Sequence, residues 1–175
     1  EMMFHHSALM VAALNGHEKS VEFLLDAGAN STLRNTSDRP ALLLAATNNH
    51  LSVVIRILDA EQSGDQTDSN GNGIWHLMAM SDVEYENSQT AFYSEQKEEN
   101  APMLMHELIS RGIMLDSLNN DGETALMIAV KRGKVRIIKN LLELGASRNI
   151  LTPDGKSALT FAEASGNDEL VKLLR

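Results

Sequence analysis

The chain has 175 residues, 43% of them apolar and 22% charged, with a net charge of −9 and no cysteine. This length suits one domain or two small ones with a core of reasonable size. The lack of cysteine excludes a disulfide scaffold, thiolate catalysis and cysteine-ligated zinc, and it suits a reducing compartment. The negative charge argues against general affinity for nucleic acid or anionic lipid, and no apolar run approaches the roughly 18 residues of a membrane span.

Five segments of the chain align with one another around a shared apolar anchor. They are SALMVAALNGH from Ser7, PALLLAATNNH from Pro40, GIWHLMAMSD from Gly73, TALMIAVKRGK from Thr124 and SALTFAEASGN from Ser157. Their anchors are 33 residues apart except for one step of 51, and they are Leu9, Leu42, Trp75, Leu126 and Leu159. Repetition at a fixed period predicts a repeat architecture.

A second apolar segment follows each of these, and its spacing is helical. These second segments are VEFLLDAGA from Val21, VIRILDAE from Val54, MHELISRGI from Met105, IKNLLELGA from Ile138 and VKLL from Val171. Small residues such as Ala12 and Ala13 in the first segments would let two helices approach closely. Each unit is therefore predicted to be two short antiparallel helices and a loop.

Glycine and hydroxyl residues mark the ends of the predicted helices. Gly28, Gly112 and Gly145 stand where the second helix must stop, as left-handed C-terminal glycines do. The glycines two residues before each new first helix favour a tight turn with positive φ, and they are Gly71, Gly122 and Gly155. Ser7, Thr124 and Ser157 recur at helix starts, so we interpret them as N-caps rather than nucleophiles.

This pattern resembles the ankyrin repeat, whose motif is roughly G-x-T-P-L-H-x-A-A-x-x-G-H with a period of 33. The fullest matches are SALMVAALNGHEKSVEFLLDAGAN at 7–30 and DGETALMIAVKRGKVRIIKNLLELGAS at 121–147. The resemblance implies an all-α, ankyrin-repeat solenoid of stacked helix-turn-helix units with β-turn or hairpin loops. We expect a single domain, 1–175, with repeats at about 1–34, 35–67, 68–118, 119–151 and 152–175.

Three residues depart from the family pattern in the second repeat. Asp38 replaces the turn glycine, Pro40 falls one position early, and Glu61 replaces the glycine that ends the second helix. The connection from the second repeat to the third is therefore expected to be the least regular turn.

The two ends of the chain differ in polarity. In the fifth unit Glu163 and Arg175 occupy positions that are apolar in other units, so this unit is expected to be a C-terminal cap that faces water. The first unit keeps Met10, Val11 and Leu14, so we expect at least one further repeat upstream. The start, EMMFHH, lacks the features of a signal peptide, and we expect a cytoplasmic or nuclear protein.

Candidate catalytic and metal sites are weak. His17 and His50 share one repeat position, and His76 occupies the motif's T-P-L-H position, where the resemblance implies a bond to a neighbouring loop. His5, His6 and His106 lack supporting ligands, so no metal site is predicted. No nucleophile has an evident base, and NGNG at 70–73 lacks the lysine of a phosphate loop. We therefore predict no enzyme and no cofactor.

Positive charge is concentrated in the fourth unit, where six cationic residues outnumber three carboxylates. The cations are Lys131, Arg132, Lys134, Arg136, Lys139 and Arg148, and the carboxylates are Asp121, Glu123 and Glu143. This is either a solvated helical face or a surface on which Lys131 and Arg132 meet an acidic partner.

The resemblance implies that turn tips and first-helix ends form a concave binding surface. The predicted partner-binding residues are Leu14, Asn15, Thr36, Ser37, Arg39, Thr47, Asn48, Ser69, Asn70, Asn72, Met80, Ser81, Asn120, Asp121, Glu123, Lys131 and Arg132. The fifth turn would add Pro153, Asp154 and Lys156. The expected partner is a protein or peptide, with no nucleic acid and no membrane insertion.

Two functional classes follow from these residues. The first is a scaffold that binds a protein or peptide without catalysis. The second is a regulatory or targeting module of a larger enzyme, channel, transcription regulator or pathogen effector. Direct binding of nucleic acid would rest on the basic fourth unit alone and is opposed by the overall charge.

An insertion at 82–99 explains the long step between the third and fourth units. It is acidic and holds Tyr85, Phe92 and Tyr93, and the register puts it between the two helices of the third unit. It is a solvated loop, a helical extension that packs its aromatic residues on the stack, or a docking or phosphorylation site around Tyr85. Long insertions in turns cost little, so all three remain open.

Overall fold

The computed structural model describes residues 6–48, 50–61, 64–81 and 103–175. Within those ranges every regular element is a helix, so the expected all-α architecture is confirmed. Contacts between Cα atoms divide the chain into two compact units. Unit 1 comprises residues 1–69 and 81–113, and unit 2 comprises residues 70–80 and 114–175. The single domain predicted for 1–175 stays a prediction.

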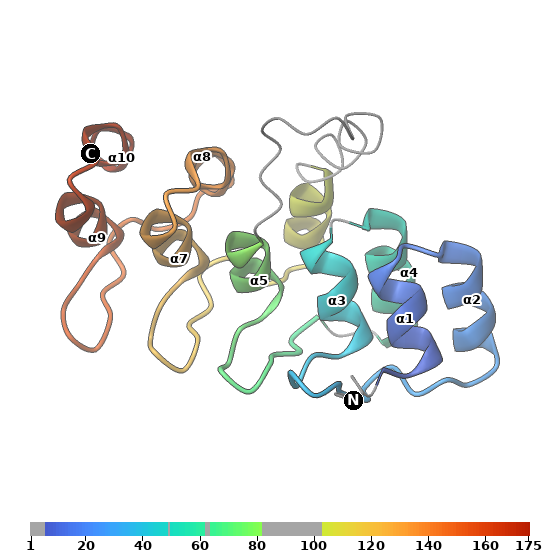
Figure 1. Ribbon diagram of the computed structural model, residues 1–175. Helices are drawn as coiled ribbons and strands as arrows, with labels where there is room; N and C mark the ends of the chain where they lie inside the picture. Colours follow the sequence, from blue (N-terminus) through green and yellow to red (C-terminus); the bar gives the residue numbers. More distant parts are fainter. Residues whose placement is uncertain (1–5, 49, 62–63, 82–102) are drawn as a thin grey trace, which may run out of the picture. The chain divides into compact units, whose positions relative to one another are not determined.

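Unit 1 contains two helical hairpins packed side by side. The first hairpin is α1 (Ala8–Leu14) and α2 (Glu18–Asp26), and the second is α3 (Ala41–Thr47) and α4 (Leu51–Glu61). Helix α1 packs on α3 and α2 packs on α4, with Ala13, Ala45 and Ala46 fully buried (Figure 1). The small side chains let the hairpins approach closely, as the sequence predicted. A further helix over 103–110 also belongs to this unit.

Unit 2 is organised around α7. Its helices are α5 (Ile74–Met80), α7 (Ala125–Lys131), α8 (Val135–Glu143), α9 (Ala158–Ser165) and α10 (Asp168–Leu174). Helix α7 packs on α5, α8 and α9, and its residues 125–130 are all buried. Among the described residues, no helix is long and apolar enough to cross a membrane.

The local signals predicted at the helix ends are confirmed. The hydroxyl oxygens of Ser7, Thr124 and Ser157 each accept a hydrogen bond from a backbone N–H in the first turn of α1, α7 and α9. The six glycines predicted to need positive φ have φ between 71° and 91°. In chain order the insertion falls between α5 and the helix over 103–110, as the register predicted.

The three departures in the second repeat have structural consequences. Asp38 adopts φ 57°, and it is the non-glycine residue with positive φ in the described part of the chain. Pro40 is the N-cap of α3 and supplies no side-chain hydrogen bond there. Because Glu61 replaces a terminating glycine, α4 continues to Glu61 itself, whereas α2 ends at Asp26, two residues before Gly28.

Candidate protein-binding surface

The loops before the first helices contain hairpin turns of one geometry. In unit 1 the Asn35 N–H donates to the Arg39 carbonyl over 3.1 Å, and the Asp38 N–H donates to the Asn35 carbonyl over 2.9 Å. The same two bonds recur at 119–123 and at 152–156 in unit 2. In unit 2 these loops project to the same side of the helices (Figure 1). The turns therefore form a repeated scaffold whose tips can carry different side chains.

The first residue of each turn holds the turn closed. The Asn35 Oδ1 accepts from the backbone N–H groups of Ser37 and Arg39 at 3.0 and 2.9 Å. The Asn119 Oδ1 makes the same pair of bonds in the fourth repeat. This position was not among the predicted site residues, although equivalent residues recur there at equal register, namely Asn35, Asp68, Asn119 and Thr152. That recurrence of residues able to bond the nearby backbone was the available signal.

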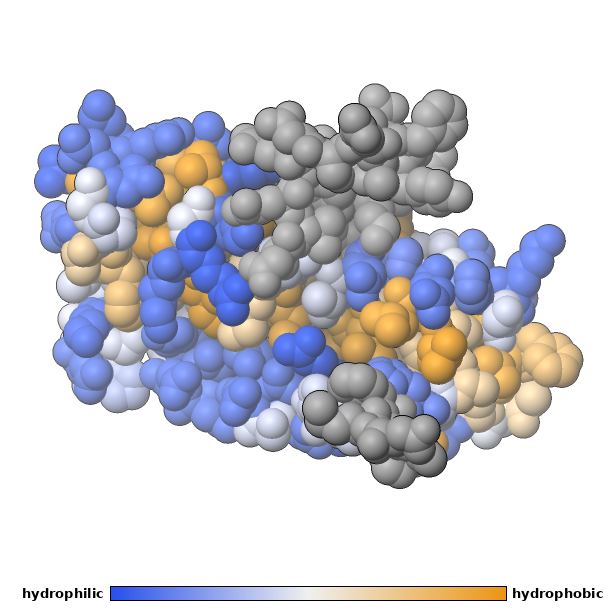
Figure 2. All heavy atoms as spheres, viewed as in Figure 1, coloured by the Kyte–Doolittle hydropathy of each residue, from blue (hydrophilic) through white to orange (hydrophobic). Residues whose placement is uncertain are grey.

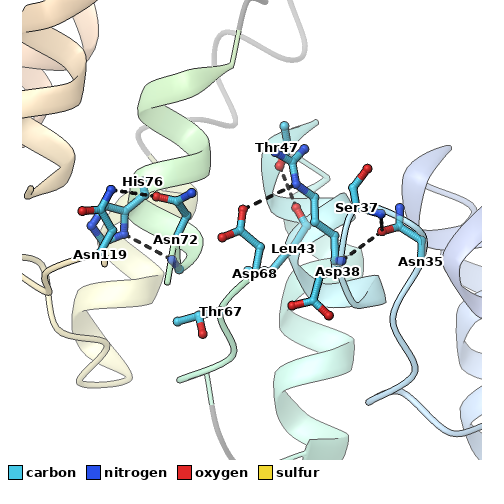
Figure 3. Close-up of polar contacts among 12 residues, drawn as sticks. Asn35, Ser37, Asp38, Leu43, Thr47, Thr67, Asp68, Asn72, His76 and Asn119 are labelled. Carbon is cyan, nitrogen blue, oxygen red and sulfur yellow. Dashed lines mark hydrogen bonds and ion pairs between the residues drawn. The ribbon is translucent and has the colours of Figure 1, made fainter. Parts of the chain in front are cut away.

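Polar side chains connect the end of one turn to the start of the next. His6 Nε2 lies 3.2 Å from Asn35 Nδ2, and Arg39 Nε lies 3.9 Å from Asp68 Oδ2 in unit 1. In unit 2 the Asn119 Nδ2 donates to Asn72 Oδ1 over 3.0 Å (Figure 3). Only 3% of Asn72 is exposed. Its prediction as a partner-binding residue is therefore corrected, because its amide is used and buried between turns.

His76 makes the loop contact that the family motif implies. Its Nδ1 accepts from the Gly73 N–H over 3.2 Å (Figure 3). Its Nε2 therefore carries the proton and donates to the Glu123 carbonyl over 3.0 Å. The ring is 1% exposed. His76 is thus a structural residue that links the third and fourth turns within unit 2.

The tip residues of the turns are the exposed part of the predicted surface. Thr36 and Ser37 are exposed in unit 1, and Asn120 and Asp121 are exposed in unit 2. Ser69 and Asn70 are exposed as well. Because the backbone bonds of the turns are made internally, these side chains can contact a partner without unfolding the turn.

At the first-helix ends in unit 1, the predicted binding residues make hydrogen bonds within the fold. The Asn15 and Asn48 side chains donate to carbonyls four residues earlier, at 2.8 and 2.9 Å. The Leu14 carbonyl lies 3.0 Å from His50 Nε2, and the Ser81 hydroxyl donates to the Thr47 carbonyl over 3.1 Å. Of the predicted binding residues here, Asn15 is exposed, and the others, Leu14, Thr47, Asn48 and Ser81, are partly buried.

In unit 2 the two predicted cations differ in their contacts. Lys131 Nζ lies 2.7 Å from Glu123 Oε1 and 5.4 Å from the centre of the Phe161 ring. Arg132 Nη1 donates instead to the Met80 carbonyl over 3.1 Å, and Met80 is partly buried. The charge of Lys131 is therefore already paired within unit 2.

The insertion residues Tyr85, Phe92 and Tyr93 lie outside the described residues. Their predicted roles in docking or modification stay predictions.

The fold and this surface define a class of protein. Two-helix units, turns of one geometry and polar contacts between successive turns make a helical repeat protein whose turn tips vary from repeat to repeat. A family model described as ankyrin repeats, in three copies, matches residues 3–70 and 91–175. The chain belongs to the ankyrin repeat family. The count of five repeats stays a prediction.

Several curated proteins are similar to most of this chain. Protein glp-1 of Caenorhabditis elegans is 26% identical over 97% of the chain, which spans 15% of that protein. A transient receptor potential cation channel subfamily A member 1 homolog of the same organism is 29% identical over 85% of the chain, which spans 11% of it. The probable E3 ubiquitin-protein ligase XBOS32 of Oryza sativa subsp. japonica is 29% identical over 81% of the chain, which spans 31% of it. The chain thus matches a minor part of each relative.

Proposed function

We propose that this chain binds a partner protein or peptide through its turn tips and first-helix ends and performs no catalysis itself. Ankyrin repeats are generally protein-interaction modules, and such domains are generally non-catalytic. The observation that carries the proposal is the exposure of Thr36, Ser37, Asn120 and Asp121 on turns whose backbone bonds are made internally. A cytoplasmic location is part of the proposal, since the chain lacks cysteine.

Affinity capture with a matched pair of variants tests this proposal. Ser37 and Asp121 occupy the same repeat position, and Ser37→Tyr/Asp121→Tyr enlarges both tips without touching the core. The control is Lys19→Ala/Lys172→Ala on the outer helices α2 and α10. We expect a set of proteins captured by the wild type and the control but lost by the tip variant. Identical capture by all three would refute binding at the tips.

A second candidate function is a regulatory or targeting module within a longer polypeptide. The relatives include a channel and a ligase, and the chain spans only 11–31% of the three relatives described above. The first repeat supports a longer chain on physical grounds. Val11 is 47% exposed, whereas Leu44 and Ile128 at the same repeat position are 6% and 4% exposed.

Apolar side chains gather over α1 and α2 of unit 1 (Figure 2). They include Val11 and Phe23, which is 73% exposed. A further repeat before the first would bury this face, because each repeat packs on its neighbours. Extending the chain by one upstream repeat is expected to raise the unfolding midpoint. An unchanged midpoint, with Val11 and Phe23 still accessible to solvent, would refute it.

A further inference from the structure

Helix α2 of unit 1 carries a large apolar side chain at a position that is polar in the next three repeats. Phe23 is 73% exposed. The same repeat position holds Arg56 in the second repeat, Glu107 in the third and Asn140 in the fourth. An exposed phenylalanine gains the free energy of burial only when another element covers it. The folding of unit 1 by itself therefore does not account for Phe23.

The contacts of Arg56 show what lies opposite this position within unit 1. Arg56 Nη2 lies 2.8 Å from Glu22 Oε1 and 3.7 Å from Asp26 Oδ1. Both carboxylates belong to α2, which is the second helix of the preceding repeat. A side chain at the position of Arg56 therefore points toward the second helix of the repeat before it. By the same register, Phe23 points toward the second helix of a repeat that would precede the first.

Two other apolar residues of the first repeat are less buried than their equivalents. Val11 is 47% exposed, whereas Leu44 at the same repeat position is 6% exposed. Leu24 is partly buried, whereas Ile57 and Leu108 at its repeat position are fully buried. The second repeat is covered by the first, because α1 packs on α3 and α2 packs on α4. No described helix covers the first repeat in the same way.

A small residue lies beside Phe23 on the same helix. Ser20 is exposed and stands where the second and third repeats bury Val53 and Leu104. Residues three positions apart on a helix are neighbours, so Ser20 leaves space next to Phe23. We call these residues the first-repeat face: Val11, Ser20, Phe23 and Leu24. Because protein interiors are close-packed, an element that covers this face needs a large apolar side chain beside Phe23.

We propose that the first-repeat face packs against a preceding repeat whose second helix presents a large aliphatic side chain to Phe23, at the position of Glu22. This inference rests on the second candidate function, a module within a longer polypeptide, and names the chemistry of the neighbouring repeat. A repeat is the occupant that fits, because the face continues the interface by which α1 and α2 pack on α3 and α4. A carboxylate against Phe23 would be partly desolvated without the cation that Arg56 supplies.

The chain itself supplies a repeat for the test. A copy of residues 34–66 placed directly before Glu1 keeps the period of 33 residues and brings Ile55 to the position of Glu22. We call this extended chain the aliphatic fusion. The acidic fusion differs from it only by Ile55→Glu in the added copy. Both fusions are also made with Phe23→Arg, which introduces the residue type found at position 56.

Thermal unfolding followed by circular dichroism compares these fusions. With Phe23 present, the aliphatic fusion is expected to unfold about 3–6 °C above the acidic fusion, since an aliphatic side chain is buried against the ring. Phe23→Arg is expected to shrink or reverse this difference, because arginine can pair with the introduced glutamate.

Iodide quenching of a Phe23→Trp variant follows the contact directly. Trp75 is the one tryptophan of the chain and is 1% exposed, so quenching reports on the introduced indole. The quenching constant is expected to fall from the unextended chain to the aliphatic fusion. Unchanged quenching would mean that the added repeat does not cover this position, and it would overturn the inference.

Three further outcomes would overturn the inference. Equal midpoints of the aliphatic and acidic fusions would show that Phe23 does not select an aliphatic neighbour. A difference that Phe23→Arg leaves unchanged would belong to the added copy alone. A dimer of the unextended chain in sedimentation analysis, abolished by Phe23→Arg, would assign the face to a second copy of this chain.

The same measurements distinguish this failure from failure of the second candidate function. Two fusions that unfold at one midpoint, higher than that of the unextended chain, would refute only the chemistry proposed at Phe23. Two fusions that unfold at the midpoint of the unextended chain would refute the preceding repeat as well.

Discussion

The replacement of His76 by alanine tests the structural link between the third and fourth turns. The ring is 1% exposed, accepts from the Gly73 N–H and donates to the Glu123 carbonyl. Alanine removes both bonds and leaves a space where the ring was. The two backbone groups then lose their side-chain partner, and Glu123 lies in a partly buried part of unit 2.

The expected loss can be worked from these contacts. Each hydrogen bond contributes about 1 kcal/mol, and the emptied space adds about 1 kcal/mol or more. The free energy of unfolding is therefore expected to fall by roughly 3 kcal/mol. For a chain of this size each kcal/mol lowers the melting temperature by about 2–4 °C, so the expected decrease is about 6–12 °C.

Thermal unfolding followed by circular dichroism measures this decrease, and His106→Ala is the control. His106 lies on the exposed side of the helix over 103–110, so its replacement is expected to change stability by less than about 0.5 kcal/mol. Equal melting temperatures for the His76 and His106 variants would refute the argument that the ring connects the two turns.

Further predictions concern a partly buried carboxylate and three turn positions. Burial raises the pKa of Glu61 above its ordinary value, although hydrogen bonds with Ser31 and Gln66 oppose the rise. Among the described residues, no hydrogen-bond partner of the buried Glu61 Oε1 is found. The folded state therefore holds the Glu61 proton to a higher pH than the unfolded state does. The contribution of the protonated Glu61 carboxyl to stability is fully present below the unfolded pKa, and it is lost as the pH rises through the folded pKa. Urea denaturation should show Glu61→Gln stabilising the chain by about 1 kcal/mol at pH 7 and by much less at pH 4, and an equal effect at both would contradict the argument. Gly155→Ala should lower the free energy of unfolding by about 1 kcal/mol, because φ is 75° at this position. No steric clash adds to this cost, since nothing lies within 4 Å of the new Cβ. Gly122→Ala should cost at least about 1 kcal/mol more, because its Cβ would lie 2.4 Å from Pro153 Cδ, and equal melting temperatures for the two variants would show that the turns yield freely. Asp38→Gly should raise stability by about 0.5 kcal/mol, since it relieves a φ of 57° and loses only a partly exposed ion pair with Arg34, whereas a lower unfolding midpoint would mean that this pair matters more than the strain.

The sequence alone was sufficient for the features that depend on local chemistry. The period of 33 residues, the caps at Ser7, Thr124 and Ser157, and the positive φ of Gly122 follow from which residues stand near one another in the chain. The second repeat keeps the same turn without the glycine, because Asp38 adopts positive φ at the position where other repeats have glycine. Short-range geometry decides these features, so aligned repeats reveal them.

Only the tertiary structure decided which polar side chains are available to a partner. Asn72 stood in the predicted binding surface, yet its amide is buried against Asn119, which lies 47 residues later in the chain. Lys131 is held by Glu123 from the preceding turn and by Phe161 from the next repeat. The register shows which positions are equivalent, but the pairing of each side chain depends on neighbours supplied by another repeat. Those contacts, and the burial that goes with them, exist only once the repeats have stacked.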